Sequence, residues 1–424
     1  MAQPAHDATD DATDDATAAP DAVPADHPLL AAARAILPEL VEVRRRLHRT
    51  PEVGLQLPKT QAIVAEQVRS LGLEVRLGET TTSVVAVIEG ARPGPTILLR
   101  ADMDGLPLRE DTGLDFASET GSTMHACGHD THMTMLLGAA RLLVERREAL
   151  AGRVLLMFQP GEEGYAGARY MLDEGLLAEG PHGAAGVERA FAIHITTRLP
   201  DGVVGLRGGS LMAASDRLVG VVTGRGGHAS APHDAVDPIT AAADLVLQLQ
   251  TAITRNVDVF DPTVLTIARI AGGTTNNIIP ERVEIEGTLR CVSDATREKM
   301  HALIGRVADG VARTHGVTIE MTIDPGYPLL ANDETTADWI LDLATKLGGP
   351  EAAERFASPI MGAEDFAYVT QAVPGAMAFL GARLPGQEEQ DAAPNHSNVV
   401  VFHEPSMAMG VALYAAAALD FLAG

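Results

Sequence analysis

Cysteines and long apolar runs are scarce in this chain of 424 residues, and their scarcity excludes several classes of protein. Two cysteines, Cys127 and Cys291, cannot build a disulfide scaffold, so we expect a reducing, cytoplasmic compartment. A membrane-spanning helix needs a run of about 18 apolar residues, and the sequence has none. The first residues also lack a basic region followed by an apolar region, so a secretory signal is not expected.

Basic residues are outnumbered as well. The chain has 32 Lys and Arg against 57 Asp and Glu, which gives a formal net charge of −25. This charge argues against binding to nucleic acid and against docking on anionic membranes. Hydrophobic residues make up 46% of the chain, which is enough for a sizeable core and for two or three domains.

Residues 1–27 differ from everything that follows. They contain seven Asp and no Lys or Arg. Such a segment buries too little apolar surface to offset the entropy of ordering it, so we expect a disordered acidic tail. An acidic docking arm is the alternative.

Hydrophobic patterning predicts an α/β protein in which one domain is inserted into another. Helical and strand-like segments alternate over residues 28–214, and this pattern returns over residues 325–424. Together these segments predict a larger, discontinuous domain with a mixed sheet flanked by helices. Residues 215–324 follow the order β-α-β-β-α-β, which predicts a ferredoxin-like domain.

The stretch "MHACGHDTH", residues 124–132, combines three histidines with one of the two cysteines. Cys127 and His129 are two positions apart, so their Cα atoms lie within about 7 Å and both side chains can reach one metal ion or a close pair. Thiolate and imidazole suit zinc and similar ions. Coincidence and a small core cysteine are the alternatives. His132 either lines the same site or packs on the following helix.

An apolar strand that ends at Pro160-Gly161 is followed by two adjacent acids, Glu162 and Glu163. Neighbouring carboxylates repel each other unless a cation compensates them. We therefore predict that Glu163 binds metal while Glu162 stays free as general base. A solvated acidic turn is the alternative.

Two further histidines are candidate ligands. His194 lies at the end of the strand-like "AFAIHI", and His396 lies in the polar loop "PNHSN". A core histidine and a surface loop histidine are the respective alternatives. With Cys127, His129 and Glu163 they make five donors, too many for one open tetrahedral zinc site. Five donors suit two metal ions about 3.5–4 Å apart, with Cys127 as the bridging thiolate.

Seven motifs resemble one known family in their order along the chain. They are "ADMDGLPL", "MHACGHDTH", "FQPGEEG", "GRGGHAS", "GGTTNNIIPERVEIEGTLR", "MGAEDFAYV" and "PNHSN". The chain resembles the metallo-amidohydrolases of peptidase family M20 over roughly residues 35–420. The most similar branch holds the aminoacylases, hippurate hydrolases and IAA-amino acid hydrolases.

The resemblance implies a catalytic domain with two divalent metal ions per subunit, and a lid domain that also forms a homodimer or a tetramer. It implies the same five ligands and Glu162 as base. The thiolate favours zinc, with manganese or cobalt as the alternatives. His228 matches a histidine that steadies the oxyanion in the partner subunit's site. Asn277 and Arg290 match residues that grip the substrate carboxylate. Without the resemblance, His228 reads as a turn histidine and Arg290 as a solvated strand residue.

Carboxylates elsewhere in these motifs are assigned supporting roles. We expect Asp102 and Asp104, at the end of "TILLRADMD", to orient ligands such as His129, and surface turn carboxylates are the alternative. Glu364 and Asp365 are expected to border the pocket. Cys291 is expected to be a packing residue.

The expected activity is hydrolysis of the amide bond of a small-molecule N-acyl-L-amino acid. A dipeptidase or carboxypeptidase with the same site is the first alternative, and a non-catalytic binding protein on the same fold is the second. The segments "HITTRLP", "HRTPEVGLQLPKT" and "MGAEDF" depart from the usual wording of the family. These departures concern the pocket wall and leave the substrate open.

Overall fold

The computed structural model describes residues 27–180 and 183–423. The tail predicted over residues 1–27 lies outside this range except for His27, whose Nδ1 accepts a hydrogen bond from Leu29 N at the start of the first helix. Among the described residues, none of the helices combines the length and the hydropathy that crossing a bilayer requires.

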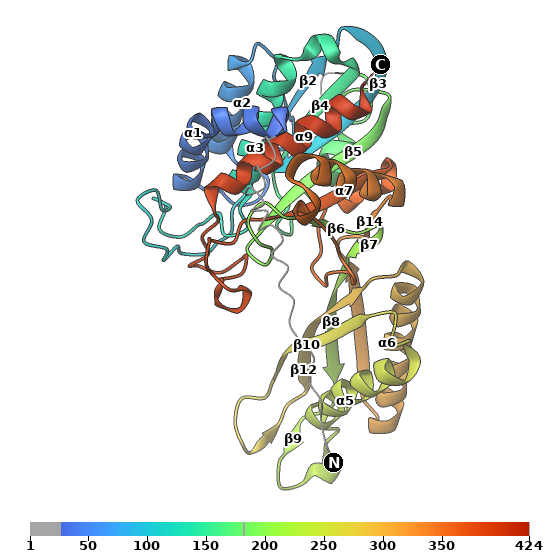
Figure 1. The fold of residues 1–424 in the computed structure, drawn as a ribbon. Helices are drawn as coiled ribbons and strands as arrows, with labels where there is room; N and C mark the ends of the chain where they lie inside the picture. The colour runs from blue at the N-terminus through green and yellow to red at the C-terminus, as the bar shows by residue number, and fades with distance from the viewer. Residues whose placement is uncertain (1–26, 181–182, 424) are drawn as a thin grey trace, which may run out of the picture.

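The larger part of the chain is built on an eight-stranded mixed sheet (Figure 1). Its order is β1 (Arg76–Leu77), β2 (Val84–Glu89), β4 (Ala151–Gln159), β3 (Arg92–Asp102), β5 (Val187–Thr196), β16 (Gly375–Gly381), β6 (Val204–Leu206) and β15 (Ala353–Arg355). The four central strands β4, β3, β5 and β16 are parallel to one another. Their carboxyl ends therefore meet at one edge of the sheet, where α/β proteins place their ligands.

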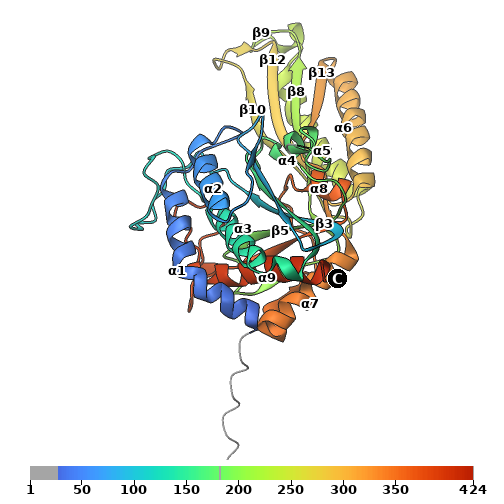
Figure 2. The ribbon, with the colours of Figure 1, turned by 90° about the horizontal axis from the view of Figure 1, so that it is seen from above.

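Helices cover both faces of this sheet (Figures 1 and 2). One face packs on α1 (Pro28–Arg49), α2 (Pro58–Ser70), α3 (His129–Val144), α7 (Glu334–Gly348) and α9 (Met407–Phe421). The other packs on α4 (Gly167–Asp173) and α8 (Ala367–Ala372). Alternate strand residues serve the two faces: Leu99 joins the first cluster and Leu98 the second. Burial on both sides explains why the middle stretches of the strands, such as "ILL" in β3 and "VLLMF" in β4, are apolar.

The smaller part is a β-α-β-β-α-β unit of one four-stranded sheet and two helices. Its elements are β8 (Ala214–Thr223), α5 (Pro238–Asn256), β10 (Thr263–Gly272), β12 (Arg282–Cys291), α6 (Asp294–His315) and β13 (Thr318–Pro325). The order β10-β12-β8-β13 is antiparallel throughout, as a ferredoxin-like sheet requires. The predicted fold class is confirmed. The domain boundaries at residues 215 and 324 stay a prediction.

Short elements complete the smaller part and its connection to the larger one. The ribbon of β9 (Gly227–His228) and β11 (Ile278–Ile279) lies at the end of the smaller part that is far from the large sheet (Figure 1). Strands β7 (Gly209–Met212) and β14 (Leu330–Asn332) pair where the chain enters and leaves the smaller part. This pairing ties together the two connecting segments.

Gly128 is a position where only glycine fits, and it lies between two candidate ligands. Its φ is +86°, and an added Cβ would lie 2.3 Å from Ile195 Cγ2. We predict that Gly128→Ala lowers the free energy of unfolding by roughly 2–4 kcal/mol, since overpacking adds to backbone strain. Urea unfolding measures this loss. The matched control is Gly113→Ala, where φ is +72° and nothing lies within 4 Å. Equal losses in both variants would contradict the steric argument.

Candidate metal centre

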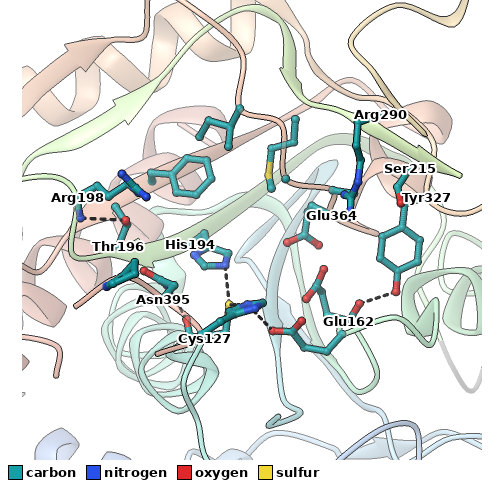
Figure 3. A pocket seen from close by; sticks show the side chains of 18 of the residues that line it. Cys127, Glu162, His194, Thr196, Arg198, Ser215, Arg290, Tyr327, Glu364 and Asn395 are labelled. Carbon is teal, nitrogen blue, oxygen red and sulfur yellow. Dashed lines mark hydrogen bonds and ion pairs between the residues drawn. The ribbon is translucent and has the colours of Figure 1, made fainter. Parts of the chain in front are cut away.

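A cavity of about 1200 Å³ lies between the two parts of the molecule (Figure 3). The larger part lines it with residues that follow the carboxyl ends of β4, β5 and β16, and with Cys127, which precedes α3. The smaller part contributes Ser215, Arg217, Arg290 and Asp324. A ligand in this cavity therefore contacts both parts of the chain.

Four of the five candidate metal ligands, Cys127, Glu163, His194 and His396, line this cavity, and the fifth, His129, is buried beside them. Cys127 is central: its Sγ lies 3.3 Å from His194 Nε2 and 3.2 Å from His396 Nε2. Glu163 Oε1 lies 3.1 Å from His396 Nε2 and 4.0 Å from His129 Nε2. The structure thus brings together side chains separated by almost 270 positions (127 to 396). That they bind metal stays a prediction.

Several ring and carboxylate atoms at this spot fit a metal site. Among the described residues, Nδ1 and Nε2 of His129 are buried and have no hydrogen-bond partner. Buried polar atoms are seldom left unpaired, so their donor set calls for a further partner. His194 Nδ1 must donate to the carbonyl of Ile195 at 2.7 Å, which leaves its Nε2 lone pair facing Cys127. Thiolate, imidazole and carboxylate donors suit zinc-like ions.

The electrostatics also favour cations at this position. Burial opposes a charge on His129, yet Asp102 and Asp104 raise its pKa to about 10. Burial, together with Glu163, raises the pKa of the Cys127 thiol well above its usual value. Burial and His132 hold the pKa of His194 well below its usual value, so its imidazole is neutral. A divalent cation would suit this negative field and would hold Cys127 as a thiolate.

The loops that carry the donors are fixed by backbone hydrogen bonds. Asp104 accepts from the N–H groups of Glu162 and Glu163 at 3.0 and 3.1 Å, which positions the acidic pair. Asn395 Nδ2 donates to the carbonyls of Cys127 and Ile195 at 3.2 and 2.9 Å. The neighbouring His396 adopts a φ of +69°, a strained value for a residue with a side chain.

Arg100 lies fully buried beneath the cluster, and the sequence analysis did not single it out. Its guanidinium binds Asp102 at 2.7 Å, Glu364 at 2.8 Å and Asp365 at 3.2 Å. Burial opposes its charge, but these carboxylates raise its pKa above the ordinary arginine value. A charged residue inside the apolar run "TILLR" was the available signal, because a buried arginine requires acidic partners.

Glu162 is buried, with 6% of its surface exposed. Burial raises its pKa well above the usual carboxyl value, and Glu364 and Glu163 add to this effect. Tyr327 donates its hydroxyl to the carbonyl of Glu162 and accepts from Ala166 N at 3.1 Å. Tyr327 therefore braces the loop that carries the predicted base. This contact was not predicted from the sequence, because "DPGYPLL" contains no pattern that indicates it.

Asp102 and Asp104 flank His129, but their shortest contacts are with other groups. Asp102 lies 3.6 Å and Asp104 3.5 Å from the ring nitrogens of His129. Asp102 instead accepts from Nδ1 of His132 at 2.6 Å, and Nε2 of His132 accepts from Ile195 N at 2.7 Å. Both ring nitrogens of His132 are therefore occupied by hydrogen bonds, one to Asp102 and one to Ile195 N. That Asp102 and Asp104 orient His129 stays a prediction.

The three predicted lid residues occupy two different places. Arg290, on β12, lines the cavity, and no described residue forms an ion pair with it. His228 and Asn277 are exposed on the distant β9–β11 ribbon and do not line the cavity. They are neighbours there, because Ala229 N donates to the carbonyl of Asn277 at 3.1 Å. Cys291 is buried in the core of the smaller part.

The sequence of this chain is similar to those of known proteins. Residues 98–420 match the model of peptidase family M20/M25/M40. Thermostable carboxypeptidase 1 of Saccharolobus solfataricus is 36% identical over 90% of this chain and 95% of its own length. IAA-amino acid hydrolase ILR1-like 2 of Arabidopsis thaliana is 35% identical over 90% of this chain and 85% of its own length.

A solved structure extends the comparison to three dimensions. A dinuclear metal-binding peptidase of the M20 family from Bacillus subtilis superposes with a TM-score of 0.79. It is 33% identical, and the match covers 92% of this chain and 99% of that protein. Sequence motifs, fold and clustered donor residues agree, and the chain belongs to peptidase family M20/M25/M40, whose members are metal-dependent hydrolases.

Proposed function

We propose that this protein hydrolyses the amide bond of N-acyl-L-amino acids to a carboxylic acid and a free amino acid. One observation carries the proposal: the buried Glu162 lies beside five convergent donors, in a cavity whose other wall presents the unpaired Arg290. A base, a metal centre and a carboxylate-binding group then face one ligand. The names of the hydrolase and carboxypeptidase relatives support amide hydrolysis.

We assign the metal centre to two divalent ions per subunit. Cys127, His129, Glu163, His194 and His396 would hold them, with Cys127 between the two because it contacts donors on both sides. Zinc is favoured by the thiolate, and manganese or cobalt are the alternatives. Bound ions supply a water of lowered pKa and polarise the amide carbonyl.

Glu162 and Arg290 divide the remaining work. Glu162 takes the proton of the attacking water and delivers it to the leaving amine, and its raised pKa suits a group that must hold that proton between the two transfers. Burial lowers the pKa of Arg290, as expected for a guanidinium without an acidic partner. Its planar fork suits the α-carboxylate of the amino acid.

We propose that His228 and Asn277 act on the cavity of the partner subunit in a homodimer. Neither residue lines the cavity of its own chain. Strand β10 is an edge of the smaller sheet, and Ile270 on it is 53% exposed. Leu247 on the adjacent α5 is 67% exposed. An open edge beside exposed apolar side chains suits pairing with a second chain.

Cleavage of dipeptides or of the carboxyl-terminal residue of peptides is a second candidate, favoured by the carboxypeptidase relative. Arg290 would bind the carboxylate of either substrate class. Comparing hydrolysis of an N-acetyl amino acid with that of the matched dipeptide separates the two. A strong preference for the dipeptide would replace the first proposal.

We predict that Glu162→Gln lowers kcat about a thousandfold, because the amide cannot accept the proton of water. Metal content, measured by elemental analysis, should stay at the wild-type value, since Glu162 is not a proposed ligand. The matched control is Glu354→Gln, an exposed acid that lines the same cavity. Retention of full turnover in Glu162→Gln would remove Glu162 from the base role.

We predict that Arg290→Met raises KM by about 10- to 100-fold, because a hydrogen-bonded charge pair contributes about 1.5–3 kcal/mol. Steady-state kinetics on one N-acyl amino acid measures it. The matched control is Arg217→Met, since Arg217 lines the same cavity but binds Glu286 at 3.1 Å. An unchanged KM in Arg290→Met, or the same rise in both variants, would contradict the assignment.

Mixed dimers test whether His228 acts on the partner's site. A dimer of one Glu162→Gln chain and one His228→Ala chain has one intact site if His228 acts in trans. We predict that purified mixed dimers recover about half of the wild-type activity, while each parent stays inactive. If mixed dimers form and recover no activity, His228 does not act on the site of the partner subunit.

A further inference from the structure

Arg198 and Arg383, which have no role in the proposed mechanism, follow two neighbouring strands at the edge of the large sheet where the donor cluster lies. Thr196 at the end of β5 pairs with Gly381 at the end of β16, and Ala382 N donates to Thr196 O at 2.8 Å. Arg198 follows Thr196 by two positions, and Arg383 follows Gly381 by two. Both arginines line the cavity.

Arg383 has no counter-charge within the part of the chain that the structure describes. Its Nη1 is enclosed and has no hydrogen-bond partner among residues 27–180 and 183–423, nor does any carboxylate of these residues form an ion pair with it. Enclosed guanidinium groups are normally paired, and the chain as a whole has a surplus of acids. Arg198 lies 3.9 Å from Glu389, and both side chains are largely exposed, so this pair is loose. Glu354 also lines the cavity and is exposed.

Arg198 lies across the donor cluster from Arg290. Figure 3 shows Arg290 on one side of Cys127 and Glu162, and Arg198 on the other side, beyond His194 and Thr196. A substrate whose α-carboxylate binds Arg290 and whose amide lies at the cluster directs its acyl group toward Arg198.

An apolar wall lies on this path. The ring of Phe379 is 5.4 Å from that of His194, and the ring of Phe356 is 5.9 Å from that of Phe379. Both phenylalanines line the cavity. Methylene groups of an acyl chain fit such a wall, and a guanidinium at its end fits a carboxylate.

We propose that Arg383, assisted by Arg198, forms a second anion subsite that binds a carboxylate at the far end of the acyl group. The inference rests on the proposed function and narrows its substrate class to amino acids acylated by a short dicarboxylic acid, such as succinyl or glutaryl derivatives. Hydrolysis consumes one water, breaks the C–N bond and releases a dicarboxylic acid and a free amino acid.

The test compares N-glutaryl and N-pentanoyl derivatives of the same amino acids on metal-replete protein. The two acyl groups differ in whether the chain ends in a carboxylate or a methyl group. The wild type should show at least a tenfold higher kcat/KM for the glutaryl substrate, equivalent to about 1.4 kcal/mol. Arg383→Gln should lower the ratio of the two kcat/KM values at least tenfold, whereas the control Arg217→Gln should leave the ratio unchanged. Equal rates in the wild type, or a ratio that survives Arg383→Gln, would overturn the subsite.

Binding separates failure of the subsite from failure of the proposed function. If neither substrate is hydrolysed, the proposed function fails. Calorimetric titration of metal-replete wild type and Arg383→Gln with glutarate and with pentanoate then decides on the subsite. A preference for glutarate that needs Arg383 supports it, and binding that is insensitive to Arg383 overturns it.

Discussion

A cluster of buried carboxyl groups, two of them at the carboxyl ends of β3 and β4, is the constraint on which the rest of this structure depends. Asp102, Glu162, Glu364 and Asp365 are all almost inaccessible to solvent. Burial raises the pKa of Glu162, Glu364 and Asp365, whereas Asp102 is held charged despite its burial by Arg100. Charges out of water are costly unless they are paired. Asp102 and Asp104 raise the pKa of His129, which indicates that a cation is favoured at this position. Two divalent ions would complete the balance.

The division of the chain into two parts follows from the same chemistry. The larger part supplies the donors and the base, and the smaller part supplies Arg290 across the cavity. Tyr327, directly after the return from the smaller part, contacts the backbone on both sides of the Glu163 loop. Ser215 N donates to the carbonyl of Tyr327 at 3.0 Å, so both connecting segments meet there. The orientation of the smaller part is thereby coupled to the loop of the base.

Features that depend on neighbouring residues could be predicted from spacing and composition, whereas contacts between segments far apart in the chain could not. The spacing of Cys127 and His129 and the adjacency of Glu162 and Glu163 are local, so their proximity was predictable. His396 was predicted to join them from its motif and the resemblance, not from spacing, and its position depends on β16 lying beside β5. The βαββαβ order of the smaller part was likewise predictable from period and composition. Contacts made by Arg100, His132 and Tyr327 needed the packed structure, because each joins segments far apart in the chain.

The most direct test of the central claim is a crystal structure of the metal-saturated protein, with anomalous scattering measured at the metal edge. The account predicts two peaks per chain about 3.5–4 Å apart, with Cys127 between them and His129, Glu163, His194 and His396 completing the coordination. A structure without metal among these five side chains, or with metal bound elsewhere, would contradict it.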